Sequence, residues 1–88
     1  MSSGKHLTWD RAQKRSLNRT CGKILTWSKD SVRTGQLSLD DAKGVAKYCQ
    51  AVLRRRPVLI RHARSDLNVH IPQHLLSELA DVAGEGIL

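Results

Sequence analysis

The clearest pattern of hydrophobic and polar positions lies between Ser38 and Pro57. Ser38 is a good N-cap, and Asp41 three residues later completes the spacing of a capping box. Pro57 cannot continue a helix, and the arginines at 54–56 suit the negative end of the helix dipole. The pattern therefore predicts a helix between these limits. Its apolar positions recur at intervals of three and four and share one side: Leu39, Ala42, Val45, Ala46, Cys49, Val52 and Leu53.

A second amphipathic pattern runs from Trp9 to about Thr34. Thr8 offers an N-cap, and Gly35 suits the left-handed residue that follows many helices. Gly22 leaves open a break or kink near the middle. Because the connection to Ser38 is short, the two helices are predicted to pack as an antiparallel hairpin. The apolar side of the first helix is predicted to contain Leu17, Cys21, Ile24, Leu25, Ser28 and Val32.

After Pro57 the pattern changes to short apolar runs. Residues 58–60 and the alternating segment 67–71 favour two strands of a β-hairpin, although a helix from Pro57 to about Arg64 fits the first run as well. Pro72 then opens a helix over residues 73–83, and Gly84 ends it. The predicted fold is mainly α: an antiparallel helical hairpin, a short β element and a C-terminal helix. Residues 9–88 form one small helical domain after a disordered N-terminus at 1–8.

The segment 67–84 resembles the strand and first helix of ribbon-helix-helix DNA-binding proteins. It shows an alternating strand, then Pro72, then a helix with leucines at the spacing of that family. In the family, the strand pairs with its twofold mate and its exposed side chains read the major groove. The resemblance thus implies a homodimer in which Asn68 and His70 contact bases. In the alternative interpretation, the apolar residues of the strand simply cover the helical hairpin.

The charge of the chain is segregated along the sequence. Its net charge is +7, and all 15 Lys and Arg lie between Lys5 and Arg64. From Ser65 onward the chain has four acidic residues and no Lys or Arg. A strongly basic front part and an acidic end indicate a polyanionic partner for the front part. The alternative is a basic surface that only keeps the protein in solution.

Helices that carry a cation at each turn present charges at intervals comparable with the spacing of phosphates. We therefore predict that the protein binds nucleic acid. DNA is favoured over RNA because the sequence shows no exposed aromatic platform for unstacked bases. In the β-hairpin interpretation, Arg61, His62 and Arg64 would lie at its tip, like the wing of a winged-helix protein. The predicted phosphate contacts are Arg11, Arg15, Arg19, Lys23, Lys29, Arg33, Lys43, Lys47, Arg54, Arg55, Arg56, Arg61 and Arg64.

Other chemistry has little support in the sequence. The cysteines and histidines lack CxxC or HxxxH spacing on one helix, so no metal or cofactor is expected. No nucleophile with a partner base and no glycine-rich phosphate loop is present, so the protein is not expected to be an enzyme. Cys21 and Cys49 do not form the framework of a secreted protein, and a disulfide between them is not favoured. Without a membrane-length apolar run or a signal peptide, we expect a soluble cytoplasmic protein that does not enter membranes.

The rival hypothesis is a protein-interaction module that binds an acidic surface of a larger enzyme or complex and inhibits or tethers it. Trp9, Trp27 or the acidic C-terminal region would then contact the partner. Under either hypothesis the sequence predicts a small regulatory or accessory protein, with a homodimer as a plausible assembly.

Overall fold

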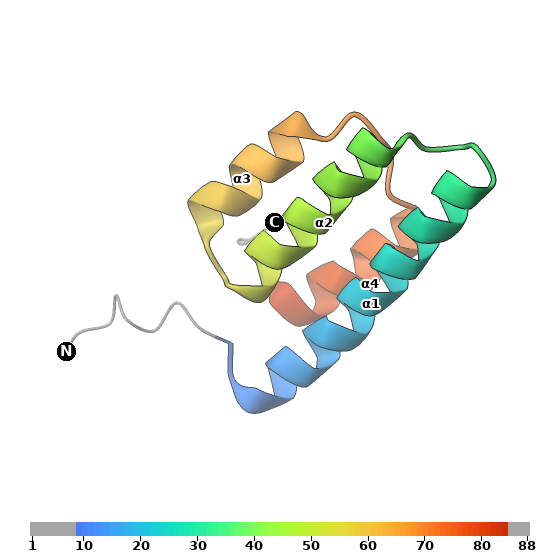
Figure 1. The fold of residues 1–88 in the computed structure, drawn as a ribbon. Helices are drawn as coiled ribbons and strands as arrows, with labels where there is room; N and C mark the ends of the chain where they lie inside the picture. Colours follow the sequence, from blue (N-terminus) through green and yellow to red (C-terminus); the bar gives the residue numbers. More distant parts are fainter. Residues whose placement is uncertain (1–8, 85–88) are drawn as a thin grey trace.

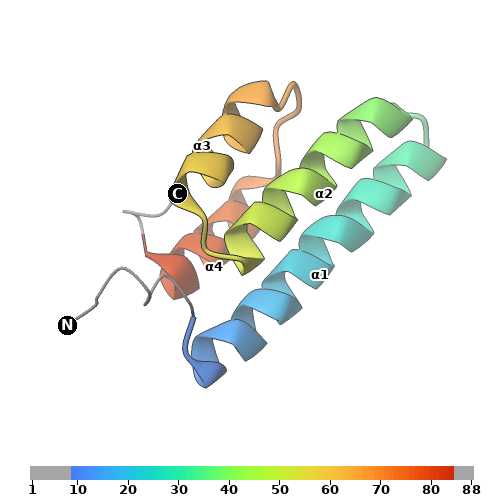
Figure 2. The same cartoon turned by 60° about the vertical axis from the view of Figure 1, so that its left-hand side comes forward.

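A computed structural model describes residues 9–84, and these residues form four α-helices (Figure 1). The helices are α1 (Arg11–Arg33), α2 (Leu39–Leu53), α3 (Pro57–Asp66) and α4 (Gln73–Ala83). α2 packs against α1 on one side and α3 on the other, while α4 packs against α1. α1, α2 and α3 lie side by side as one layer with α4 behind it (Figure 1, Figure 2). The predicted mainly α class is confirmed, and α1 and α2 form the predicted hairpin.

The start of α1 is fixed by Asp10. Its carboxylate accepts a hydrogen bond from the Gln13 backbone N–H at 2.8 Å, and the Gln13 side chain accepts one from the Asp10 N–H at 3.3 Å. This reciprocal capping box satisfies two of the donors that a helix N-terminus leaves open. The prediction of Thr8 as the N-cap was wrong, since α1 begins at Arg11, and Thr8 itself lies outside the described residues. α1 continues through Gly22 without a break.

The turn between α1 and α2 is set by Gly35, as predicted. This residue has a φ of +81°, its N–H donates to the Val32 carbonyl at 3.1 Å, and the next N–H donates to the Ser31 carbonyl at 2.7 Å. These two bonds form a Schellman motif, which needs a left-handed residue at this position. Ser38 then caps α2 and accepts from the Asp41 N–H at 3.1 Å, which confirms the predicted start.

The arginines at 54–56 form a corner rather than the last turn of α2. α2 ends at Leu53, and Arg55 has a φ of +49°. Backbone bonds from Arg55 to Val52 (2.9 Å) and from Arg56 to Ala51 (3.2 Å) repeat the Schellman pattern without a glycine. Pro57 forces the residue before it out of the helical region, so the chain has to leave α2 before reaching it.

The predicted β element was wrong, because residues 57–66 form α3. The open alternative, a helix begun at Pro57, is the correct one. Ile60 is fully buried and Ala63 is half-buried, three residues apart, so the segment presents a helical face to α2. Residues 67–71 form neither helix nor strand and bend at Val69; Ile71 is buried, and the exposed Asn68 and His70 alternate with apolar neighbours. This alternation is the predicted one, but no strand pairing occurs within residues 9–84.

The core is mostly aliphatic, with the buried rings of Tyr48 and Trp9 added, and it centres on the seam between α1 and α2. Leu17, Ile24, Val45 and Val52 have no exposed surface. The buried side of α1 is wider than predicted, because α4 covers a second part of it. Three small polar residues of α1 are also buried: Ser28, which the apolar pattern included, and Thr20 and Ser31, which it did not mark.

The helix α4 has the predicted bounds, and one carboxylate links it to α1. Glu78 Oε2 accepts from the Thr20 hydroxyl at 2.7 Å, and Lys23 Nζ donates to Oε1 at 3.0 Å and to Oε2 at 3.1 Å. The Thr20 hydrogen bond and the Lys23 ammonium hold the pKa of Glu78 below its usual value. The carboxylate is therefore ionised at neutral pH and ties the two helices together.

Both cysteines are free thiols in the seam. Cys21 Sγ lies 4.0 Å from the Cys49 carbonyl oxygen, and both residues are 1 % exposed. A hydrogen bond with the Cys21 thiol, together with burial, raises the pKa of Cys49 far above its ordinary range. The Cys49 thiol therefore stays protonated and behaves as a small core residue.

We expect the Gly35→Ala variant to lose about 1–2 kcal/mol of unfolding free energy, because an alanine at this positive φ is strained. The matched control is Gly22→Ala, an exposed position within α1 where an added Cβ meets no atom within 4 Å. This change should gain about 1 kcal/mol from helix propensity. Urea denaturation measures both, and a shift of the same sign in the two variants would contradict the assignment of the turn.

A pH series tests the link between α4 and α1. Because the pKa of Glu78 is lowered on folding, its contribution is complete above the pKa of an unfolded glutamate, about 4.3, and is lost as the pH falls through the lower folded value. Glu78→Gln should be less stable than the unaltered protein at pH 7, and this difference should shrink in that acidic range. If the difference in unfolding free energy between the two proteins stays constant from pH 7 to below the folded pKa of Glu78, the link does not stabilise the fold.

Candidate nucleic-acid interface

The solvent side of α1 carries a row of cations. Arg11, Arg15 and Arg19 follow one another at every fourth residue and are all exposed. At a rise of 1.5 Å per residue, neighbours in this row are about 6 Å apart along the helix axis. Lys29 lies on the same side of the helix as Arg11, about five turns farther along. The row runs over most of the length of α1.

Most of this row is not neutralised by the protein's own carboxylates. Arg33 pairs with Asp30 at 2.9 Å, and Lys23 pairs with Glu78. The other predicted contacts on α1 make no ion pair with any acid in the range 9–84: Arg11, Arg15, Arg19 and Lys29. Their charge is therefore available to an external anion.

The solvent side of α2 adds further cations beside those of α1. Lys43, Lys47 and Arg54 are exposed and lie on the side of α2 opposite the buried Val45 and Val52. α1 and α2 pack side by side, and each helix carries its cations on the side away from the seam. We call the combined cations of both helices the hairpin surface; it consists of Arg11, Arg15, Lys29, Lys43, Lys47 and Arg54.

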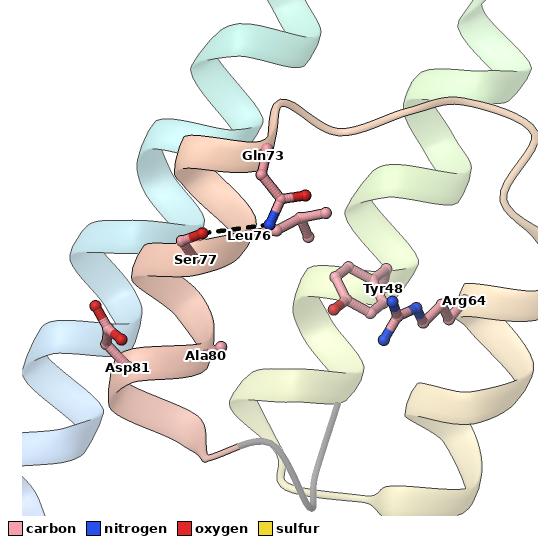
Figure 3. Close-up of a pocket in the computed structure, with 7 residues that line it drawn as sticks. All are labelled: Tyr48, Arg64, Gln73, Leu76, Ser77, Ala80 and Asp81. Atoms are coloured by element: carbon pink, nitrogen blue, oxygen red, sulfur yellow. Dashed lines mark hydrogen bonds between the residues drawn. The ribbon is translucent and has the colours of Figure 1, made fainter.

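Arg61 and Arg64 do not lie at the tip of a wing, because α3 takes the place of the predicted β-hairpin. Arg64 lines a groove of about 380 Å³ between α3 and α4, where its guanidinium lies beside the ring of Tyr48 (Figure 3). Lys47 and Arg54 line a different hollow, between α2 and α3. The predicted cations thus surround the molecule on several sides instead of sharing one face.

The groove in Figure 3 has its own polar residues. Gln73 Nε2 donates to Ser77 Oγ at 3.3 Å on the α4 side, and Tyr48, which is 1 % exposed, forms the opposite wall. Burial raises the pKa of the Tyr48 hydroxyl, and the nearby charge of Arg64 opposes this only in part. The hydroxyl therefore stays neutral at physiological pH.

Arg55 and Trp9 contact each other and hold the chain before α1 against the end of α2. The Arg55 guanidinium carbon lies 4.6 Å from the centre of the Trp9 ring, a cation–π distance. Trp9 is 8 % exposed, and its Nε1 donates to the Val52 carbonyl at 2.7 Å. These contacts attach Trp9, which precedes the N-cap of α1, to the end of α2. Trp9 offers little surface to a partner, so of the two tryptophans only Trp27 remains a candidate contact.

Sequence reasoning missed Lys14 and the surroundings of Trp27. Lys14 is exposed one turn after Arg11, so the same helical spacing would have found it. Trp27 is half-buried and lines a shallow hollow with residues of α4, beside Arg19. No sequence signal indicates that hollow, because it depends on how α4 packs against α1.

The segment 67–71 leaves the ribbon-helix-helix hypothesis open as a prediction. Asn68 and His70 are exposed, as the resemblance requires. Strand pairing in that family occurs between two copies, and this structure contains a single chain. The homodimer and the base contacts of Asn68 and His70 therefore remain predictions.

Comparisons of the chain with models of known protein families, with curated proteins and with solved structures find no match. Within the described range, no three His, Cys, Asp or Glu side chains gather where they could hold a metal ion. None of the helices in this range has the length and apolar character to cross a membrane.

Trp9→Phe should lower the unfolding free energy by about 1 kcal/mol, because the donor to the Val52 carbonyl is lost while most of the buried ring remains. Thermal or urea denaturation measures the change. Trp27→Phe is the matched control: no hydrogen bond of the Trp27 indole is present in residues 9–84, so the loss should be smaller. Equal losses in the two variants would show that the Trp9 hydrogen bond does not stabilise the fold.

Proposed function

We propose that this protein binds DNA through the phosphate backbone, with the hairpin surface as the contact. The observation that carries the proposal is the row of α1 cations that have no carboxylate partner among residues 9–84. A protein that neutralises phosphates releases their counterions, and this release drives binding. Lys43, Lys47 and Arg54 on α2 extend the same contact.

The dimensions of α1 suit this role. Its 23 residues span about 34 Å, which is close to one turn of B-DNA. The part of the chain that the structure describes measures 49 × 23 × 16 Å. Phosphate contacts position a protein without specifying a base sequence, so we expect binding with little sequence preference.

The biological role that fits is that of a small regulatory or accessory protein acting on DNA. A cytoplasmic location belongs to the same proposal, since two free thiols are typical of proteins in a reducing compartment. A homodimer would double the number of phosphate contacts and is compatible with the exposed segment 67–71.

The salt dependence of binding tests the proposal. A variant that combines Arg11→Ala, Arg15→Ala and Lys29→Ala should bind DNA more weakly. The slope of log affinity against log salt concentration should become shallower by about 2–3, because each lost phosphate contact removes about 0.9 from it. Fluorescence anisotropy with a labelled DNA over a salt series measures both quantities.

Arg33→Ala supplies a matched control on the same helix. Arg33 is exposed like the others but is already paired with Asp30, so its removal should change the slope by less than one of the three unpaired cations does. If the unaltered protein does not bind DNA even at low salt, or if the triple variant keeps the full slope, the hairpin surface is not a DNA contact.

A second candidate function is the binding of an acidic protein surface. It is favoured by the hollow of about 330 Å³ between α2 and α3, where Leu59 is 47 % exposed and Lys47 and Arg54 lie at the edge. An apolar side chain of a partner would fit among Leu59, Ala51 and Ala63 while its carboxylates meet the two cations. Leu59→Ser would weaken such binding and leave DNA binding unchanged, which separates the two functions.

A further inference from the structure

A shallow hollow opens on the flank of α1, where the first turn of α4 approaches it. Gly22, Thr26 and Trp27 line it from α1, and His74 and Leu75 line it from α4. Trp27 is half-buried and packs against the core, so one part of its indole is held in place while another borders the hollow. The hollow therefore presents a fixed aromatic ring at the surface.

Gly22 keeps this hollow open. It lies in the middle of α1, is exposed, and has no atom within 4 Å of the place where a Cβ would stand. A glycine in an exposed helix is less stable than an alanine, and nothing in the described part of the chain requires one here. Its bare backbone lets a flat group from outside approach α1 next to Trp27.

The charge at the edge of the hollow continues the row on α1. Arg19 lines the hollow, and it follows Arg15 and Arg11 in the row of unpaired cations. Lys23 also lines it, although its ammonium group is bound to Glu78. Asp30, the acid among the lining residues, is paired with Arg33. An anionic strand that follows the row would therefore lead to the hollow.

We propose that this hollow binds one unpaired base of single-stranded DNA, with the base against Trp27 and its neighbouring phosphate on Arg19. Proteins that bind single strands combine a cationic track for the backbone with aromatic rings for the bases. This inference rests on the proposed DNA-binding function and narrows it from DNA in general to an unpaired strand. A base inside a duplex is stacked on both faces and cannot enter such a hollow.

The choice of a deoxyribose strand rests on the proposed DNA-binding function, because the walls contain the polar Thr26, Asp30 and His74 as well as the apolar Gly22 and Leu75. The sequence favours DNA over RNA because it shows no exposed aromatic platform, whereas the structure places the half-buried Trp27 at this hollow.

The experiment compares two labelled DNA strands of about 12 nucleotides that have the same phosphates. One is oligo-dT, and the other has abasic sites in place of all bases. The unaltered protein should bind oligo-dT about tenfold more tightly, since stacking of one base contributes about that factor. Trp27→Leu should remove this preference and leave binding to the abasic strand unchanged.

A second variant fills the hollow without touching Trp27. Gly22→Leu should fold normally, because no atom lies within 4 Å of the added Cβ, and it should weaken oligo-dT binding by about fivefold or more. The matched control is Asn18→Leu, which adds the same side chain to an exposed position on α1 outside the hollow and should leave oligo-dT affinity unchanged. Circular dichroism confirms that each variant is folded.

The outcomes separate this inference from the proposed function. Absence of binding to both strands at low salt would overturn the proposed function and this inference with it. Equal affinity for oligo-dT and the abasic strand, with a steep salt slope, would overturn the base site alone. Tighter binding to oligo-U RNA than to oligo-dT would overturn the choice of DNA. Unchanged oligo-dT binding in folded Gly22→Leu would place the base elsewhere.

Discussion

The seam between α1 and α2 is the contact on which the rest of the molecule depends. Leu17 and Ile24 on one helix and Val45 and Val52 on the other are withdrawn from water completely, and the two thiols fill the space between them. α3 packs closely on α2, and α4 packs closely on α1, so each outer helix reaches the core through a different member of the hairpin. The seam also directs both charged sides outward.

Local chemistry made several elements predictable from the sequence. Ser38, Gly35 and Pro72 act within one turn of their own positions, so their effects do not depend on the rest of the fold. Predictions failed where distant contacts decide. The run at 58–60 is too short to choose between strand and helix until Ile60 meets α2, and the burial of Thr20 follows from the packing of α4.

The residues of the candidate site also fall into those that local pattern placed correctly and those whose position depends on distant contacts. Helical spacing placed Arg11, Arg15 and Lys29 on the solvent side of α1, because that position depends only on the period of the helix. The same spacing says nothing about which neighbours a side chain meets. Arg55 against the Trp9 ring is a product of the corner, which the pattern did not predict. Arg64 in the groove of Tyr48 is a product of α3, which the pattern left open as an alternative to the β-hairpin.

α4 packs on α1 with Leu75, Leu79 and Ala83 buried and the Glu78 carboxylate bound at the edge, and this arrangement divides the surface of α1 into two parts. The cationic row lies on α1 alone, whereas the Trp27 hollow is lined by both α1 and α4 and therefore needs His74 and Leu75 in place. Since Glu78 joins α4 to α1 from partly exposed positions, detachment of α4 would erase the hollow and spare the row. Under the proposed function, general adhesion to a polyanion and discrimination between its forms would be carried by separable parts of one small molecule.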